Sequence, residues 1–119
     1  MKNFLAVFTG TKDSPQRAAW DKLDEATRNA RQAAGMKAWG EWMTKHERAV
    51  VAGPGGPLGK TKRISPKGIA DVSNNLAAFV MVQAESHEEA ARMFENHPHF
   101  SIFPGEAVEV MPVLPIPRQ

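Results

Sequence analysis

Two histidines flank a proline near the end of the chain, in the segment His97-Pro98-His99. In extended backbone their side chains project to the same side, because residues two apart share a face. Imidazole titrates near neutral pH, so the pair could supply a general base or two metal ligands. A third metal ligand is not evident in the sequence and would have to arrive through folding. The structural alternative is that His97 hydrogen-bonds the end of the preceding helix and offsets its dipole.

A second group of candidate residues lies at helical spacing, Trp39, Trp42, Met43 and His46. Aromatic residues at this spacing are most often part of a core. Two tryptophans on one helix that faces a sheet could also form the wall of an apolar pocket. In that case His46, at the end of the stripe, would orient a ligand or act as a general base.

The segment between Glu47 and Asp71 contains no acidic residue, and it holds a cluster of four basic ones: Lys60, Lys62, Arg63 and Lys67. A solvated loop is the simplest interpretation. The alternative is an anionic ligand or phosphate group, for which Arg63 is the candidate ligand-binding residue. A nucleic-acid partner is not expected, because no aromatic residues are interleaved with the basic ones.

The sequence PGGPLGKT, residues 54–61, resembles a phosphate-binding P-loop, but the resemblance does not extend to its chemistry. The first glycine of that motif falls on Pro54, and neither Pro54 nor Pro57 can donate a backbone N–H to a phosphate. We therefore expect the glycines of this segment to shape a tight turn at the rim of a pocket.

The centre of the expected fold is a strand and a helix in residues 75–100. Residues 76–84 are apolar at nearly every position, which is typical of a strand covered on both faces. Ser86 and Glu89 have the spacing of a capping box, so a helix should begin there. Pro98 is expected to end it, because the residue before a proline is disfavoured in helical backbone.

The remaining elements follow from periodicity and from capping signals. Ser14, followed by Pro15, predicts a helix start, and Gly35 should break or bend the long helical run that follows. We expect strands at residues 2–9, 49–52, 60–65 (an edge segment) and 106–111, a second helical run at 36–47, and loop at 66–75. Three prolines predict an extended tail.

This order predicts an α+β fold, a ferredoxin-like four-stranded antiparallel sheet with helices on one face. The first and central strands are nevertheless apolar on both sides. At about 25 cal/mol per Å² of apolar surface, an uncovered face would forfeit many kcal/mol. We therefore predict a homodimer in which two sheets pack face to face into a dimeric α/β barrel.

Length and composition fit a single domain, residues 1–112, followed by a Pro-rich tail, residues 113–119. The 119 residues include no cysteine, which excludes disulfides and thiolate chemistry, and the net charge is +2. No metal or other cofactor is expected. The apolar runs are too short for a membrane span or a signal peptide, so we expect a cytoplasmic protein without a membrane partner.

Four segments together resemble the YCII-related domain family: KAWGEWMTKH (37–46), AGPGGPLG (52–59), FVMVQAESHEEAARMFENHPHF (79–100) and AVEVMPV (107–113). The resemblance spans nearly the whole chain. It implies a ferredoxin-like fold, a dimeric α/β barrel, and a function that is mostly unassigned, with enzymatic roles proposed for some members.

The sequence departs from that family at one important place. The founding branch is associated with a histidine on the first helix and an aspartate just before a Pro-aromatic pair, suggested as a catalytic dyad. Here His97 occupies the position before the proline, and the helix position falls near Met36, with no histidine in register. That dyad is not carried over to this chain.

Two functions are consistent with these residues. The first is a small-molecule-binding homodimer whose pocket lies between the sheet and the Trp39–His46 helix, with His97 and His99 at the rim. The second is a cofactor-free enzyme, an isomerase, lyase or lactone-opening catalyst, that uses His97 or His46 as a general base.

Overall fold

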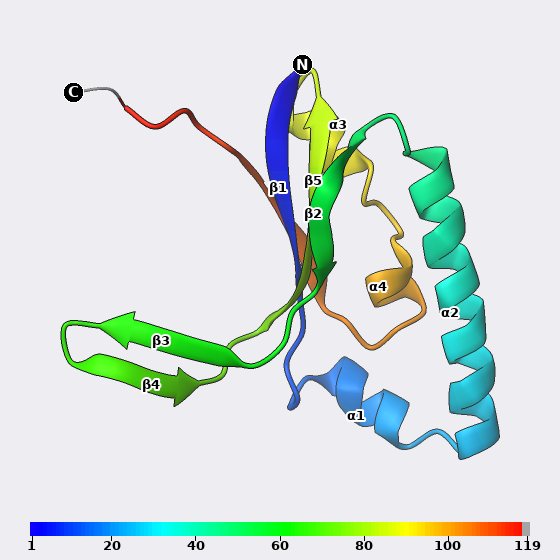
Figure 1. Cartoon of the computed structure of the whole chain (residues 1–119). Coiled ribbons are helices and arrows are strands. Elements are labelled where there is room, and N and C mark those ends of the chain that lie inside the picture. Colours follow the sequence, from blue (N-terminus) through cyan, green and yellow to red (C-terminus); the bar gives the residue numbers. More distant parts are fainter. Residues whose placement is uncertain (118–119) are drawn as a thin grey trace.

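The computed structural model describes residues 1–117, so Arg118 and Gln119 of the Pro-rich tail lie outside the described part, as do the side chains of residues 52–54. Figure 1 shows the elements in chain order: β1 (Lys2–Thr9), α1 (Pro15–Asp21), α2 (Glu25–Lys45), β2 (Val50–Pro57), β3 (Thr61–Ser65), β4 (Gly68–Val72), β5 (Leu76–Ala84), α3 (His87–Arg92), α4 (Pro98–Ser101) and β6 (Ala107–Pro112).

Four strands form the main sheet in the order β2-β5-β1-β6, and each neighbouring pair is antiparallel. The helices α1 and α2 connect β1 to β2, and α3 and α4 connect β5 to β6, so two β–α–β units interleave. The predicted α+β class with an antiparallel sheet is confirmed, and the strand order is that of the ferredoxin-like pattern. Figure 1 views this sheet edge-on, with the helices on one side of it.

The core lies between the helices and one face of the sheet. Alternate residues of β1, Phe4, Ala6 and Phe8, are at most 2% exposed. Their partners on β5 point to the same side and are buried as well, Val82 opposite Phe4 and Val80 opposite Ala6. Trp42 from α2 and Phe94 after α3 complete the cluster. Because side chains alternate between the two faces of a strand, every second residue of β1 and β5 packs against the helices.

The helical region differs from the prediction of a run that breaks at Gly35. The break falls earlier, between α1 and α2, where Asp24 caps α2 by accepting a hydrogen bond from Thr27 N at 2.7 Å. Gly35 lies inside the unbroken helix α2. Glycine at this position allows Phe103 to pack closely against α2, because a Cβ here would lie 2.5 Å from the Phe103 ring.

The segment after α2 also differs from the prediction. The Gly- and Pro-rich residues expected to end a short strand form the continuation of β2, an edge strand, where proline is tolerated. The strand expected at residues 60–65 is present as β3, but it is not an edge strand of the main sheet, and residues 66–75 are not a loop. Instead β3 and β4 pair with each other as a separate two-stranded hairpin, which we call the arm.

The prediction for the end of the central helix is wrong. Ser86 caps α3 as expected, by accepting a hydrogen bond from Glu89 N at 3.1 Å. However, α3 ends at Arg92, and Pro98 begins the short helix α4 instead of ending a long one. His97 is the N-cap of α4, so His97 and His99 do not lie on one side of an extended strand.

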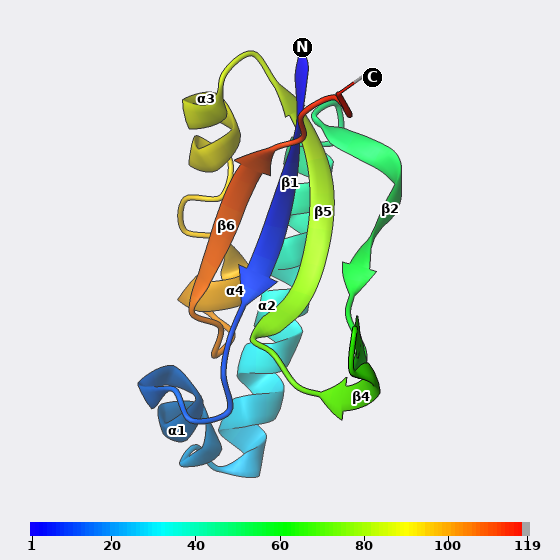
Figure 2. The same cartoon turned by 90° about the vertical axis from the view of Figure 1, so that its left-hand side faces the viewer.

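The opposite face of the main sheet carries no helix, as the view in Figure 2 shows. This open face presents Leu5 and Val7 from β1, Phe79 and Met81 from β5, and Met111 from β6, which the register brings side by side. In the described part of the chain, no helix is both long enough and apolar enough to cross a membrane.

Candidate functional site

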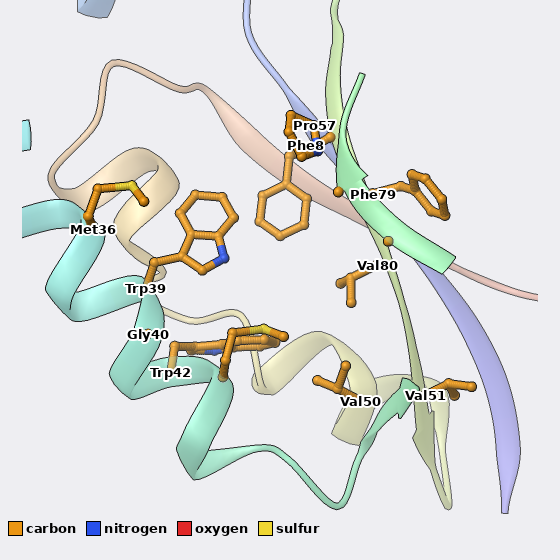
Figure 3. A pocket seen from close by; sticks show the side chains of 14 residues that line it. Phe8, Met36, Trp39, Gly40, Trp42, Val50, Val51, Pro57, Phe79 and Val80 are labelled. Atoms are coloured by element: carbon orange, nitrogen blue, oxygen red, sulfur yellow. The ribbon is translucent and has the colours of Figure 1, made fainter. Parts of the chain in front are cut away.

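A cavity of about 620 Å³ lies between α2 and the β2–β5 edge of the main sheet. Its side-chain lining is apolar, and none of the residues that border it is charged. Figure 3 shows the lining: α2 contributes Met36, Trp39, Gly40, Trp42 and Met43, and the sheet contributes Phe8, Val50, Val51, Gly55, Gly56, Pro57, Ala78, Phe79 and Val80. Of these, Phe79 borders the cavity although its ring points away from α2, toward the open face. The volume falls within the usual range of small-molecule sites, about 300–1,000 Å³.

The spacing of residues on α2 builds one wall of the cavity. Met36, Trp39, Gly40 and Met43 recur at three- and four-residue steps, so they lie on one face of the helix. Gly40 has open space where a side chain would begin, since no atom lies within 4 Å of the place that a Cβ would occupy. The missing side chain therefore adds room to the cavity.

An irregularity in β2 builds the other wall. Val50 pairs with Val82 and the next pair is Gly55 with Val80, so residues 51–54 stand opposite Met81 alone. Extra residues of this kind make a strand bend away from its partner. Figure 2 shows β2 bowed outward from β5 at this level. The bend is consistent with the space that separates the sheet edge from α2.

The two tryptophans differ in their polar contacts. Trp42 is 8% exposed and its indole N–H donates to Met93 O at 2.7 Å, which fixes the ring. Trp39 is half-buried, and its ring stacks on Phe8 with centroids 5.1 Å apart. Unlike Trp42, Trp39 donates no hydrogen bond from Nε1 to any of the described residues, and Figure 3 shows this edge of the ring turned toward the cavity.

His97 lies behind this wall and is fully buried. Its ring lies 4.5 Å from Trp39, 4.9 Å from Trp42 and 5.0 Å from Phe8, measured between centroids. His97 Nδ1 accepts a hydrogen bond from His99 N at 3.0 Å, so the neutral ring carries its proton on Nε2. Nε2 has no partner among the described residues.

Burial lowers the pKa of His97 to about 4, and the neighbouring imidazoles of His99 and His46 act in the same direction. The hydrogen bond described above is consistent with this shift, because a protonated ring would direct an N–H against the backbone N–H of His99. His97 is therefore neutral at physiological pH. A role as a general base would require the ring to leave its present hydrogen bond.

The other two candidate histidines hold different positions. His99 is 8% exposed and its Nε2–H donates to Thr9 O at 2.8 Å, which ties α4 to the end of β1. Burial lowers its pKa, while the hydrogen bond to Thr9 opposes the shift. His46 is half-buried and its ring lies 4.5 Å from that of Trp42. Its Nδ1–H donates to Trp42 O at 3.0 Å, so the lone pair of the neutral ring is on Nε2.

The structure thus brings some of the sequence candidates together and separates others. Trp39, Trp42 and Met43 line the cavity, and His97 and His46 lie behind its tryptophans. Arg63 is exposed on β3 of the arm and does not border the cavity. Within residues 1–117, no group of three or more His, Asp or Glu side chains is placed to hold a metal ion.

Sequence reasoning missed several contributors to the cavity, among them Phe8 and Gly40. Phe8 could have been found from the period of two in β1, which places it on the same face as Phe4 and Ala6. Gly40 lies one turn of helix from Met36 and Met43, so helical spacing alone assigns it to the same face. Only the path of β2 shows that this face borders an empty space.

No protein-family model matches the sequence, and no curated protein matches it. Among solved structures, the chain is similar to 5-chloro-2-hydroxyhydroquinone dehydrochlorinase from Burkholderia phenoliruptrix AC1100, in complex with 2,5-dihydroxybenzoquinone. The two share 21% sequence identity over 91% of this chain and 89% of that chain, with a TM-score of 0.48. The site described above is therefore argued from the geometry of this chain.

Proposed function

We propose that this protein is a homodimeric small-molecule-binding protein of YCII-related type. Its ligand would occupy the cavity between α2 and the β2–β5 edge. The observation that carries this proposal is a cavity of about 620 Å³ with an uncharged aromatic lining, toward which the Trp39 indole N–H is turned. Such a lining suits a flat, neutral, largely apolar molecule with a hydrogen-bond acceptor.

An anionic ligand is less compatible with this cavity. Burying a charge away from water is costly unless an opposite charge or several hydrogen bonds compensate it. The basic residues that suggested an anion, Arg63 among them, lie on the arm, and the lining contains no cation. A neutral ligand is therefore the proposal.

The test compares two probes of nearly equal size, naphthol and naphthoate, of which the second is an anion at pH 7. We expect naphthol to raise the melting temperature and to change tryptophan fluorescence, because Trp39 and Trp42 border the cavity. Naphthoate at the same concentration should do neither. Equal binding of naphthoate would contradict the proposed ligand class.

A matched pair of substitutions locates the binding. Gly40→Leu places a side chain into the cavity, where no atom lies within 4 Å, so it should abolish the naphthol response while the chain stays folded. Ala33→Leu makes a similar addition at an exposed position of α2 and should leave the response unchanged. Binding that survives Gly40→Leu would exclude this cavity as the site.

The homodimer belongs to the same proposal and is supported by the open face of the main sheet. Leu5 lies between Met81 and Met111 across the strands, and Val7 lies beside Phe79. These apolar neighbours are only partly covered in a single chain, and no helix crosses them (Figure 2). A second copy packed sheet to sheet would cover them and gain the corresponding hydrophobic free energy.

A cofactor-free enzyme in the same cavity is the second candidate. Of the two histidines proposed as its base, one observation favours His46, which lies behind Trp42 and would reach a substrate only past that ring. The donated hydrogen bond from His46 Nδ1 leaves the Nε2 lone pair available to accept a proton, whereas His97 uses its lone pair to accept from His99 N. His46→Gln should then abolish turnover of a bound substrate without weakening its binding. Unchanged turnover would exclude His46 as the base.

A further inference from the structure

The arm formed by β3 and β4 exposes a matched pair of large apolar side chains. Ile64 pairs with Ile69 across the two strands, next to the turn at Pro66 and Lys67. The two side chains are 73% and 72% exposed, among the highest values for large apolar residues of the strands. A two-stranded hairpin alone is marginally stable in water. An arm of this kind gains stability if another surface covers its isoleucine pair.

The direction of the arm indicates where that surface lies. Figure 1 shows the arm projecting from the sheet on the side opposite to the helices, below the open face. The extended tail after β6 leaves on the same side, at the other end of the sheet. Its apolar residues are also exposed, Leu114 at 75% and Ile116 at 90%. The arm and the tail therefore lie at opposite ends of the open face of the main sheet.

The overall dimensions agree with a chain that reaches beyond its own core. The radius of gyration is 16.4 Å, and the extents are 57 × 42 × 22 Å. A compact domain of this length has a radius of gyration of about 13–14 Å. The difference reflects arm and tail residues that do not fold back onto their own body.

The charged residues beside Ile64 and Ile69 indicate which kind of partner binds this face of the arm. On that face Lys62 forms an ion pair with Asp71 at 2.7 Å, so the face is apolar and electrically neutral. Arg63 points to the other face, because neighbouring strand residues alternate. A nucleic acid or an anionic membrane would favour unpaired cations beside the apolar residues. A neutral apolar face is instead typical of contact with protein.

The open face of the sheet has the complementary character. Its apolar residues surround one charged side chain, Glu109, which is exposed and lies beside Val7. Among the described residues that point to this face, none is a cation. The arm carries Lys60, Lys62, Arg63 and Lys67 with Asp71 as its acid, so it is basic as a whole although its isoleucine face is neutral. The neutral isoleucine face suits the apolar residues of the open face, and the net positive charge of the arm complements Glu109.

We propose that the arm is a clasp for a second copy of this chain. In the assembly, each arm lies against the partner, where Ile64 and Ile69 are buried. This inference rests on the homodimer proposed above and adds that the arm, besides the sheet face, holds the two copies together. In one chain the arm projects beyond the sheet on the side of the open face (Figure 1), which is the side that a second copy would occupy in the proposed homodimer.

The first test weakens the apolar pair without removing the hairpin. The double variant Ile64→Thr, Ile69→Thr keeps β-branched residues, so the arm should still form. We expect its dimer dissociation constant, measured by sedimentation over a dilution series, to rise by about tenfold or more, on account of the lost apolar burial. Ala70→Thr on the opposite face of the arm is the control and should leave the constant unchanged. An unchanged constant in the double variant, or an equal weakening in the control, would overturn the clasp.

The second test uses the absence of cysteine from the chain, which makes a single introduced thiol the only one present. The thiol introduced by Ile69→Cys should react with a maleimide about tenfold more slowly at dimer-forming concentrations than after dilution, because the partner covers it. Gln32→Cys, at an exposed position of α2, should react at one rate throughout. Adding Leu5→Lys, which places a charge in the open face, should restore full reactivity of the arm thiol.

These tests separate the arm from the dimer itself. A dimer whose arm thiol stays as reactive as that of Gln32→Cys would overturn the clasp and leave the sheet-face dimer intact. A chain that is monomeric at every concentration would overturn both. Protection of the arm thiol that appears only with phosphatidylglycerol vesicles, or only with duplex DNA, would also overturn the clasp and assign the arm to that other partner.

Discussion

At the scale of single residues, His97 links the chemistry of the site to the stability of the fold. It is fully buried among aromatic rings, and it caps α4 by accepting a hydrogen bond from His99 N. Both properties require the neutral form of the ring. Because the pKa of His97 falls to about 4 on folding, protonation and folding are coupled.

This coupling predicts a loss of stability in mild acid. The unfolded chain binds a proton at His97 below pH 6.5, while the folded chain does not until about pH 4, the pKa of the buried ring. The stabilisation is thus complete above pH 6.5 and is lost as the pH falls toward 4, which amounts to about 3 kcal/mol for this residue. Urea denaturation at pH 7 and in mild acid, just above the pKa of the folded state, measures the difference.

The control for this prediction is His97→Asn, which retains an acceptor for the α4 cap but cannot titrate. The variant should be less stable than the wild type at pH 7, because it leaves space among Trp39, Trp42 and Phe8. Its free energy of unfolding should nevertheless depend less steeply on pH. Identical slopes in the two proteins would show that His97 is not the group responsible.

At the scale of elements, α2 is one unbroken helix that contains two glycines with opposite surroundings. A Cβ at Gly35 would lie 2.5 Å from Phe103 and 3.1 Å from Ile102, so this glycine lets α2 approach the segment after α4. At Gly40 no atom lies within 4 Å of the corresponding position. The same residue type therefore serves packing at one position and the cavity at the other.

The two glycines give a matched pair of substitutions. Gly40→Ala should raise the free energy of unfolding by about 1 kcal/mol, the usual gain in helix propensity. Gly35→Ala has the same gain but must displace the ring of Phe103, and overpacking of this kind costs about 1–3 kcal/mol. We expect Gly35→Ala to be destabilising overall. Equal stabilisation of both variants in urea denaturation would contradict the close contact between α2 and Phe103.

At the scale of the whole molecule, the sheet has one face covered by helices and one face without them (Figures 1 and 2). The proposed homodimer predicts a mass by light scattering of about twice the 13.1 kDa of one chain at micromolar concentration. Leu5→Lys should shift this mass to that of a monomer, because it buries an unpaired charge between Met81 and Met111 in the dimer.

The folded state should tolerate that substitution, since Leu5 belongs to the open face and lies outside the buried cluster beneath the helices. A circular dichroism spectrum like that of the wild type is the control. A wild-type chain that scatters as a 13.1 kDa particle at all concentrations would contradict the dimer.

Part of the fold can be predicted from local sequence patterns. The strand predicted at residues 2–9 coincides with β1, and the helix start predicted at Ser14 and Pro15 agrees with α1. Both predictions use residues that are close in sequence. The strand follows from the alternation of its side chains, and the helix start follows from its N-cap. The strand predicted at residues 60–65 agrees with β3, whereas the loop predicted at 66–75 is wrong. Pro66, Lys67 and Gly68 are typical of a turn, but the strand β4 that begins there depends on its pairing with β3.

The strands, the helix caps and the apolar character of both faces of β1 and β5 can be derived from the amino-acid sequence, because they follow from periodicity and from side-chain chemistry near each residue. Three other features emerge only in the folded chain: α2 runs straight through Gly35, His97 turns inward as a cap, and β2 bends away to leave a cavity beside Trp39. Each of these features depends on contacts between segments far apart in the chain, such as Gly35 with Phe103. The free energy of such contacts depends on how side chains pack in the folded state, so local sequence patterns do not predict it.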